Sequence, residues 1–215
     1  ALKENLGDSL SLYSSVILAP RFDQTEIDRV RATWIAQINQ EKARPAGIGG
    51  RVLRKEVYGN GHPYAVPASG LGEVTSIDSL SQSEMQAWHK QFIRPDNATI
   101  MVVGDTTLAE LLPKLEKTFG QWQAPTSSKP TAKVPNVALP TKNRVILIDQ
   151  PGAIQANIMI GQLVPSSLSD EATQFEIANS ILGGEFSSRL NMNLREDKHW
   201  SYGSYSGVGG AIGQR

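Results

Sequence analysis

The chain has 215 residues, of which 40% are hydrophobic and 20% are charged, enough for one large or two small domains with a real core. Lys and Arg together number 21, as do Asp and Glu together, so the charge balance gives no reason to expect nucleic acid or an anionic membrane as a partner. The absence of cysteine excludes disulfides, thiolate metal sites and cysteine nucleophiles.

The first and last residues of the sequence resemble segments from the interior of a longer chain. The first residues lack the basic and apolar regions of a signal peptide, and no apolar run approaches the roughly 20 residues that span a bilayer. The chain begins inside a helical pattern and stops after GVGGAIGQR without a capping pattern. We therefore expect a piece of a longer chain.

Helical patterns dominate the first third of the chain. A helix is expected over 8–18, because Pro20 disfavours helical backbone at the residue before it. Asp23 and Glu26 have the spacing of a capping box, which predicts a second helix over 26–40. Its apolar residues recur at helical spacing, at Ile27, Val30, Trp34, Ile35 and Ile38.

Three further helices are expected before residue 120. One covers 50–57, and the Gly- and Pro-rich stretch 62–74 after it is typical of a loop. Ser81 and Glu84 form an S-x-x-E capping box that begins the next helix. The last covers 108–119.

Residues 123–142 differ in composition from both flanks. They contain four prolines and few large apolar residues, which is typical of an extended linker. The linker divides the chain into a first unit, 1–122, and a second unit, 143–215. In the second unit, helices are expected over 170–182 and through Leu190 and Leu194.

Short apolar runs rich in β-branched residues predict strands on both sides of the linker. They lie at 98–103, 144–148, 155–163 and 202–205. Strands that are segregated from pairs of helices favour an α+β fold over a regular βαβ alternation.

The three histidines, His62, His89 and His199, offer no zinc motif. None has another His or a Glu four residues away on one helix face, so the H-E-x-x-H and H-x-x-E-H motifs are both missing. Each is expected to be a surface or turn histidine.

The segment that contains Gly183, Gly184, Ser187 and Ser188 admits two interpretations. It is either a glycine break followed by a capping serine, or a loop of small residues that lets another backbone, such as a peptide substrate, approach closely. The residues themselves favour the first interpretation.

Arg195 and Tyr202 lie on either side of a short predicted turn. The guanidinium fork and the phenol hydroxyl both donate hydrogen bonds, so together they can hold a peptide carbonyl or stabilise an oxyanion. A surface arginine beside a core tyrosine is the simpler alternative.

Several of these segments, in this order, resemble the pitrilysin/insulinase (M16) zinc metallopeptidases. In the first unit they are the run from Pro63 through Pro95 to Asp105, and within it GEVTSI at 72–77. In the second they are LGGEFSSRL at 182–190 and LRE at 194–196 followed by Tyr202. The resemblance implies two LuxS/metallohydrolase-like units, each a mainly antiparallel sheet with helices packed on one face. The residues themselves do not show the compartment, for which the resemblance suggests a periplasmic or exported bacterial protein.

The resemblance further implies a division of labour between two halves. In the catalytic half of such an enzyme, zinc is held by an H-x-x-E-H helix and a later Glu. Here the position of that later ligand falls at Gln37, and a neutral amide is not a usual zinc ligand. The chain is thus expected to bind no metal itself and to resemble the non-catalytic half, which supplies an Arg/Tyr pair to the substrate.

Two functions follow as hypotheses from this resemblance. The first is part of a zinc metalloendopeptidase, with a peptide or small protein as substrate and with zinc held by a catalytic M16 half in the same chain or a partner subunit. The second is a catalytically inactive, peptide-binding or structural M16-like subunit of a larger assembly.

Overall fold

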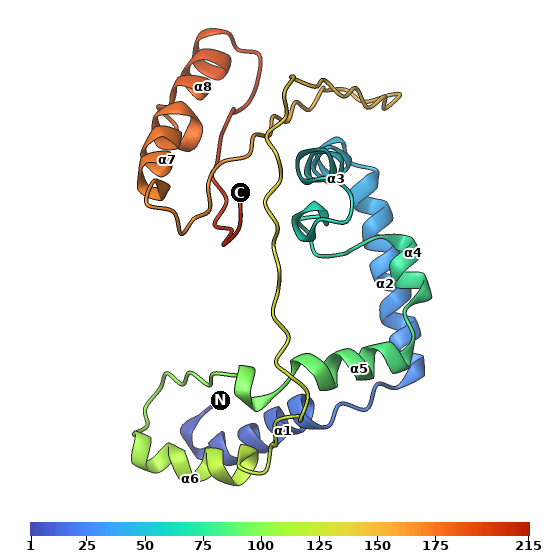
Figure 1. The fold of residues 1–215 in the computed structure, drawn as a ribbon, viewed down its shortest axis with the longest axis vertical. Coiled ribbons are helices and arrows are strands. Elements are labelled where there is room, and N and C mark those ends of the chain that lie inside the picture. The colour runs from blue at the N-terminus through green and yellow to red at the C-terminus, as the bar shows by residue number, and fades with distance from the viewer. The chain divides into compact units, whose positions relative to one another are not determined.

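A computed structural model describes residues 1–215, in which helices are joined by extended and irregular segments (Figure 1). The chain divides into two compact units, one formed by Ala1–Gln40 and Leu71–Ala132 and the other by Glu41–Gly70 and Lys133–Arg215. The prediction of a linker over 123–142 between two M16 units stays a prediction. None of the helices combines the length and the apolarity needed to cross a membrane.

Unit 1, Ala1–Gln40 and Leu71–Ala132, is built around the packing of its first helix on its last. Its elements in chain order are η1 (Lys3–Asn5), α1 (Leu6–Leu18), α2 (Gln24–Lys42, which runs just past the unit boundary), α4 (Val74–Ser79), α5 (Gln82–Phe92), η3 (Pro95–Asn97) and α6 (Leu108–Phe119). Helix α1 contacts α6, with the rings of Tyr13 and Phe119 edge to face at 6.4 Å. The His89 ring bonds to the Ile17 carbonyl at 2.8 Å and so links α5 to the end of α1.

The capping box predicted for α5 is confirmed. The Ser81 hydroxyl accepts from the Glu84 N–H, and the Glu84 carboxylate accepts from the Ser81 N–H at 2.8 Å. The box predicted from Asp23 and Glu26 does not form. Asp23 accepts from the N–H of Thr25 instead of that of Glu26, and the Glu26 carboxylate is engaged by Arg29. A charged partner one helical turn away competes for the carboxylate that the box would need.

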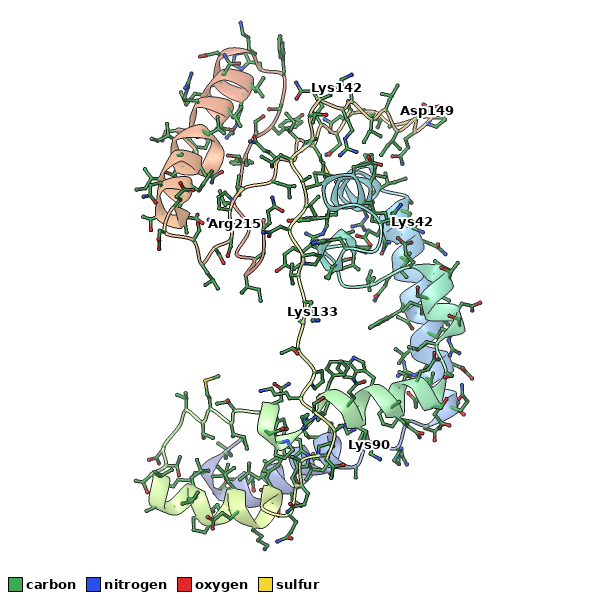
Figure 2. The ribbon with its side chains drawn as sticks, viewed as in Figure 1. Lys42, Lys90, Lys133, Lys142, Asp149 and Arg215 are labelled. Atoms are coloured by element: carbon green, nitrogen blue, oxygen red, sulfur yellow. The ribbon has the colours of Figure 1, made fainter.

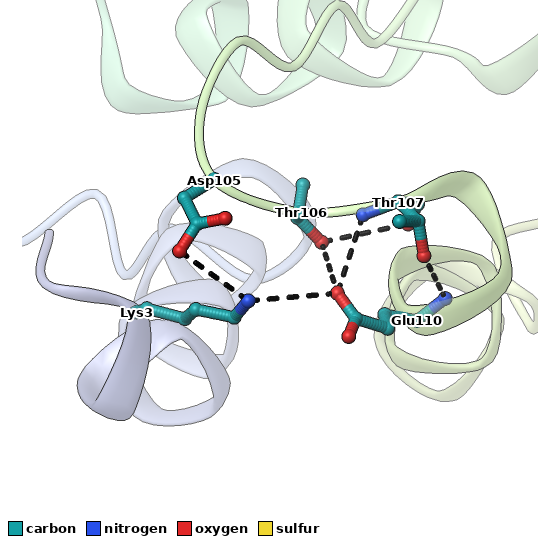
Figure 3. A network of polar contacts seen from close by, with 5 residues as sticks. All are labelled: Lys3, Asp105, Thr106, Thr107 and Glu110. Atoms are coloured by element: carbon teal, nitrogen blue, oxygen red, sulfur yellow. Dashed lines mark hydrogen bonds and ion pairs between the residues drawn. The ribbon is translucent and has the colours of Figure 1, made fainter.

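Helix α6 has a capping box that the sequence analysis missed (Figure 3). Thr107 and Glu110 exchange hydrogen bonds between side chain and backbone at 3.3 and 3.2 Å. The Lys3 ammonium lies 3.8 Å from Glu110 and 3.5 Å from Asp105, so charge also ties the amino-terminal turn to the start of α6.

Arg94 connects η3 to the segment that follows α6. Its guanidinium is buried, forms a two-pronged ion pair with Asp96, and donates to the carbonyls of Pro125, Ser127 and Ser128. A planar fork of donors can satisfy several acceptors in this way. The beginning of the predicted linker is therefore fastened to η3.

Unit 2 contains the remaining helical elements. They are α3 (Pro45–Tyr58), η2 (Pro63–Ala65), α7 (Ala172–Asn179), η4 (Ser180–Gly184), α8 (Arg189–Asn191) and η5 (Met192–Asp197), where η4 and η5 are π-helical. Helix α3 begins before the predicted 50–57, because Pro45 is suited to the first helical position. In unit 1, helix α4 was not predicted, because the Gly- and Pro-rich stretch 62–74 that leads into it indicated a loop.

Aromatic residues hold distant segments of unit 2 together. The His62 ring stacks on Tyr58 at 5.0 Å, accepts from the Tyr64 N–H and bonds to the Pro135 carbonyl at 2.9 Å. The Tyr64 hydroxyl in turn accepts from the Gly213 N–H at 3.1 Å. His62 is a turn histidine as expected, but it is buried rather than on the surface.

The predicted α+β fold, with a mainly antiparallel sheet in each unit, is wrong for this chain, because the structure contains no strand. The segments 98–103, 144–148 and 155–163 leave apolar side chains exposed, with Val103 fully exposed and Val145 96% exposed. A strand forms only where a second segment bonds to its edge. A β-branched run shows the propensity for a strand and does not by itself supply that partner.

Two extended segments of unit 2 do bond to each other near the carboxyl end. Val164 and Arg215 exchange backbone hydrogen bonds, and the Ser167 N–H donates to the Ala211 carbonyl. The Arg215 guanidinium, labelled in Figure 2, is buried and donates to the carbonyls of Pro165 and Gly209 and to Glu176. This places residues 211–215 beside residues 164–167, which precede α7, and the Arg215 side chain beside Glu176 of α7.

Candidate functional site

The candidate site lies in unit 2, where η5 ends and the chain turns back. Arg195 lies in η5, and Tyr202 lies in the extended segment after the turn. Three backbone hydrogen bonds close the turn: Lys198 N–H to Asn193, His199 N–H to Arg195, and Trp200 N–H to Leu194. His199 adopts a left-handed backbone conformation with φ of 57°, which a tight reversal needs.

Arg195 is half-buried and has two partners within the chain. Its guanidinium carbon lies 4.9 Å from the centre of the Phe186 ring, and its Nε lies 3.5 Å from the Glu196 carboxylate. The first contact is a cation–π interaction and the second an exposed ion pair. Most N–H groups on the edge of the guanidinium therefore remain free to donate.

Tyr202 is 89% exposed, so its hydroxyl can also meet a ligand. No hydrogen bond joins it to Arg195. The alternative of a core tyrosine does not fit this exposure. The pair thus offers two donors at one turn, whose joint role in binding substrate stays a prediction.

Two asparagines fasten the segment that follows Tyr202. Asn191 is fully buried, donates to the Phe186 carbonyl at 2.7 Å and accepts from the Ser204 N–H at 3.3 Å. Asn179, at the end of α7, bonds to Ser206. Neither asparagine was predicted from the sequence, because its only signal is an amide side chain at a helical position, where Asn is a poor helix former.

Gly183 is buried against the chain's own backbone. A Cβ at this position would lie 2.4 Å from the Ser206 hydroxyl and 2.6 Å from the Ser206 nitrogen, and the Gly183 carbonyl accepts from that N–H. At Gly184 the nearest atoms would belong to Asn179, at 3.0 Å. The close approach that small residues permit is thus made by Ser206 in this structure, and a role in substrate approach stays a prediction.

The two serines differ in environment. Ser187 is exposed, whereas Ser188 is 3% exposed and its hydroxyl has no hydrogen-bond partner in the chain. Ser188 precedes α8, but its side chain makes no capping bond. The prediction that a serine of this segment caps the following helix is therefore wrong for Ser188.

The residues of this chain do not fit a zinc ion. Gln37 lies exposed on α2, and no group of three or more His, Cys, Asp or Glu side chains that could hold a metal lies together in residues 1–215. His89 is half-buried and His199 is exposed. No step of a reaction is therefore assigned to a metal held by this chain.

An apolar pocket of about 370 Å³ lies elsewhere, in unit 1, between α2 and the α4–α5 segment. Ile27, Trp34, Ile77 and Met85 are among its lining residues. None of the predicted site residues lines it.

The profile of the peptidase M16 inactive domain matches residues 79–214, a range that includes the turn with Arg195 and Tyr202. The chain belongs to the M16 peptidase family, as an inactive domain. The family resemblance seen in the sequence is thereby confirmed.

Curated relatives of this M16 domain carry names of two kinds. The chain is 24% identical over 205 residues to a protein of Bacillus subtilis named uncharacterized zinc protease YmxG, covering 95% of the chain and 48% of that protein. It is 20% identical over 213 residues to the non-peptidase homolog YmxG of Helicobacter pylori, covering 95% of the chain and 46% of that protein. The M16 domain thus spans about half the length of these relatives.

Two solved structures share the fold of the M16 domain. One is a peptidase M16 inactive domain from Pseudomonas fluorescens, with a TM-score of 0.77 and 23% identity over 99% of the chain and 50% of that structure. The other is a protease from Helicobacter pylori, with a TM-score of 0.81 and 18% identity over 99% and 50%.

Proposed function

We propose that this M16 domain is the non-catalytic half of a zinc-dependent metalloendopeptidase, closing the chamber around a peptide and supplying Arg195 and Tyr202 to it. Residues 1–122 and 143–215 belong in this proposal to two M16 units, joined by 123–142. The zinc belongs to a catalytic half in the same polypeptide or in a partner subunit. Family membership and the relatives named zinc proteases support the proposal.

The observation that carries the proposal is the state of the two donors. Arg195 keeps most of its N–H edge uncommitted, and Tyr202 is exposed on a segment that hydrogen bonds hold in place. Because hydrogen bonds already order the backbone near Tyr202, and Phe186 and Glu196 contact the Arg195 side chain, binding a ligand here costs less conformational entropy.

The chemistry open to this half is electrostatic. The Arg195 guanidinium and the Tyr202 hydroxyl can donate to the carbonyl oxygen of the peptide bond that is cut, and these bonds strengthen as negative charge develops on that oxygen. The zinc of the catalytic half would activate the attacking water. This chain's residues would bind and orient the peptide.

The test is peptide hydrolysis by the complete protein that carries this chain. Arg195→Ala and Tyr202→Phe should each lower kcat/KM by more than about tenfold, as the loss of an oxyanion donor does. Arg189→Ala, an exposed arginine of α8, and Tyr205→Phe are the matched controls and should leave turnover unchanged. Wild-type turnover in both test variants would refute this role.

The second function, an inactive peptide-binding or structural subunit, is favoured by the Helicobacter pylori relative that is named a non-peptidase homolog. It predicts peptide binding without any hydrolysis that a zinc chelator abolishes. Measuring chelator-sensitive cleavage and binding on the same preparation separates the two functions, because only the peptidase shows both.

A further inference from the structure

The contact between Phe186 and Arg195 is not explained by burial of the ring. Phe186 is 56% exposed, so the ring gains little from a hydrophobic core. Its identified ring contact is the Arg195 guanidinium, at 4.9 Å from the ring centre. This distance is within the roughly 6 Å at which a cation is attracted to an aromatic face.

Stacking on an aromatic face leaves an arginine able to bind a ligand. The Arg195 guanidinium carbon lies over the Phe186 ring, and its fork of five N–H donors keeps groups that neither the ring nor Glu196 engages. The Glu196 carboxylate, in contrast, competes for those N–H groups from 3.5 Å. The contact with the Phe186 ring therefore limits how far Glu196 can draw the guanidinium away.

The backbone under Phe186 is fixed to the helix that carries Arg195. Asn191, fully buried at the end of α8, donates to the Phe186 carbonyl at 2.7 Å. The Ser188 N–H donates to the Glu185 carbonyl and closes the turn before α8, which continues directly into η5. The Phe186 ring and the Arg195 guanidinium thus extend from one short segment whose backbone is held by hydrogen bonds.

We infer that Phe186 is a positioning residue, whose ring holds the Arg195 guanidinium with its N–H edge toward a peptide carbonyl. The inference rests on the proposed role of Arg195 in peptide binding. It adds a residue that touches no substrate and acts only through Arg195.

The experiment measures the affinity of the complete protein for fluorescein-labelled casein peptides by anisotropy. Phe186→Leu keeps apolar bulk but removes the aromatic face, and should weaken binding by about two- to fivefold, the equivalent of one exposed cation–π contact. Phe186→Trp should restore wild-type affinity. In an Arg195→Ala background, Phe186→Leu should have no further effect, because the effect passes through Arg195.

A second measurement reports the contact directly. In the wild type, the Arg195 side-chain NMR signals should be shifted upfield by the ring, and Phe186→Leu should abolish that shift. If the leucine variant does not fold, Phe186→Met serves in both measurements, since Met fills the space flexibly without a π face.

The outcomes separate this inference from the proposed function. If Arg195→Ala weakens binding and Phe186→Leu does not, the inference is overturned and the proposed function stands. If Phe186→Leu weakens binding equally with and without Arg195, the ring acts by another route and the inference is also overturned. If Arg195→Ala leaves binding unchanged, Arg195 does not hold the bound peptide and the inference is overturned, whereas the turnover of the same variant decides the proposed function.

Discussion

Asn179 and Ser206 form a reciprocal pair: the Ser206 hydroxyl donates to the Asn179 Oδ1 at 2.8 Å, and the Asn179 Nδ2 donates to the Ser206 carbonyl at 3.3 Å. The pair joins the end of α7 to the segment that follows Tyr202. The position of Tyr202 therefore depends on a residue more than twenty positions before it.

Asn179→Ala should lower the free energy of unfolding by about 1–2 kcal/mol, because a half-buried hydroxyl and a carbonyl lose their partner. Urea unfolding followed by circular dichroism measures the change. Asn193→Ala is the matched control, since this asparagine is exposed and its side chain makes no hydrogen bond. Equal effects of the two variants would show that the pair contributes nothing.

Gly183→Ala should lower the free energy of unfolding by about 1–3 kcal/mol, the range for an overpacked site. The new methyl group would meet the Ser206 backbone nitrogen at 2.6 Å, and backbone cannot rotate aside as a flexible side chain can. Gly207→Ala is the control, because a Cβ there meets nothing within 4 Å. The midpoint of denaturant unfolding gives the comparison, and a Gly183→Ala midpoint equal to that of the control contradicts the close packing.

Ser188→Ala should leave the free energy of unfolding unchanged or slightly raised, since it removes a buried hydroxyl that has no partner. Ser81→Ala should instead lower the free energy of unfolding by about 1 kcal/mol, because Ser81 caps helix α5. Parallel thermal and urea unfolding of the two variants tests the contrast. A clear loss of stability in Ser188→Ala would reveal a hydrogen bond that this structure does not contain.

The Ser81–Glu84 capping box should make stability depend on pH. Hydrogen bonds from the Ser81 side chain and backbone hold the pKa of Glu84 below its ordinary value of 4.5. Ionised Glu84 therefore stabilises the folded state above pH 4.5. This stabilisation is lost as the pH falls through the lowered pKa.

The prediction is a wild-type advantage over Glu84→Gln that is present near neutral pH and shrinks below pH 4.5. Urea midpoints across the acid range measure it. With Ser81→Ala in both proteins, the pH dependence of the difference should flatten. An advantage that grows on acidification would have the wrong sign for this box.

Arg94→Lys should release residues 125–129 from η3. A lysine ammonium cannot at once pair with both Asp96 oxygens and donate to the carbonyls of Pro125, Ser127 and Ser128, as the guanidinium does. Amide hydrogen exchange over this segment should become faster. Arg21→Lys, a change at an exposed arginine, should leave it as in the wild type.

Features that depend on neighbouring residues in the chain could be predicted from the sequence. The helices α1, α2, α5 and α6 follow from apolar spacing, proline positions and, in α5, a capping box that closes over four residues. The order of short motifs was enough to indicate the M16 family, which the match over residues 79–214 confirms. Such signals are local, so no tertiary contact is needed to see them.

Features that need a contact between residues distant in the sequence could be seen only in the folded structure. The segments at 98–103 and 144–148 have strand propensity but no bonded edge, Gly183 is small because Ser206 lies against it, and Arg195 faces a ring nine residues earlier. Pairing, close packing and cation–π contacts are made across space. A linear pattern can name the residues that make such contacts, but only folding selects their partners.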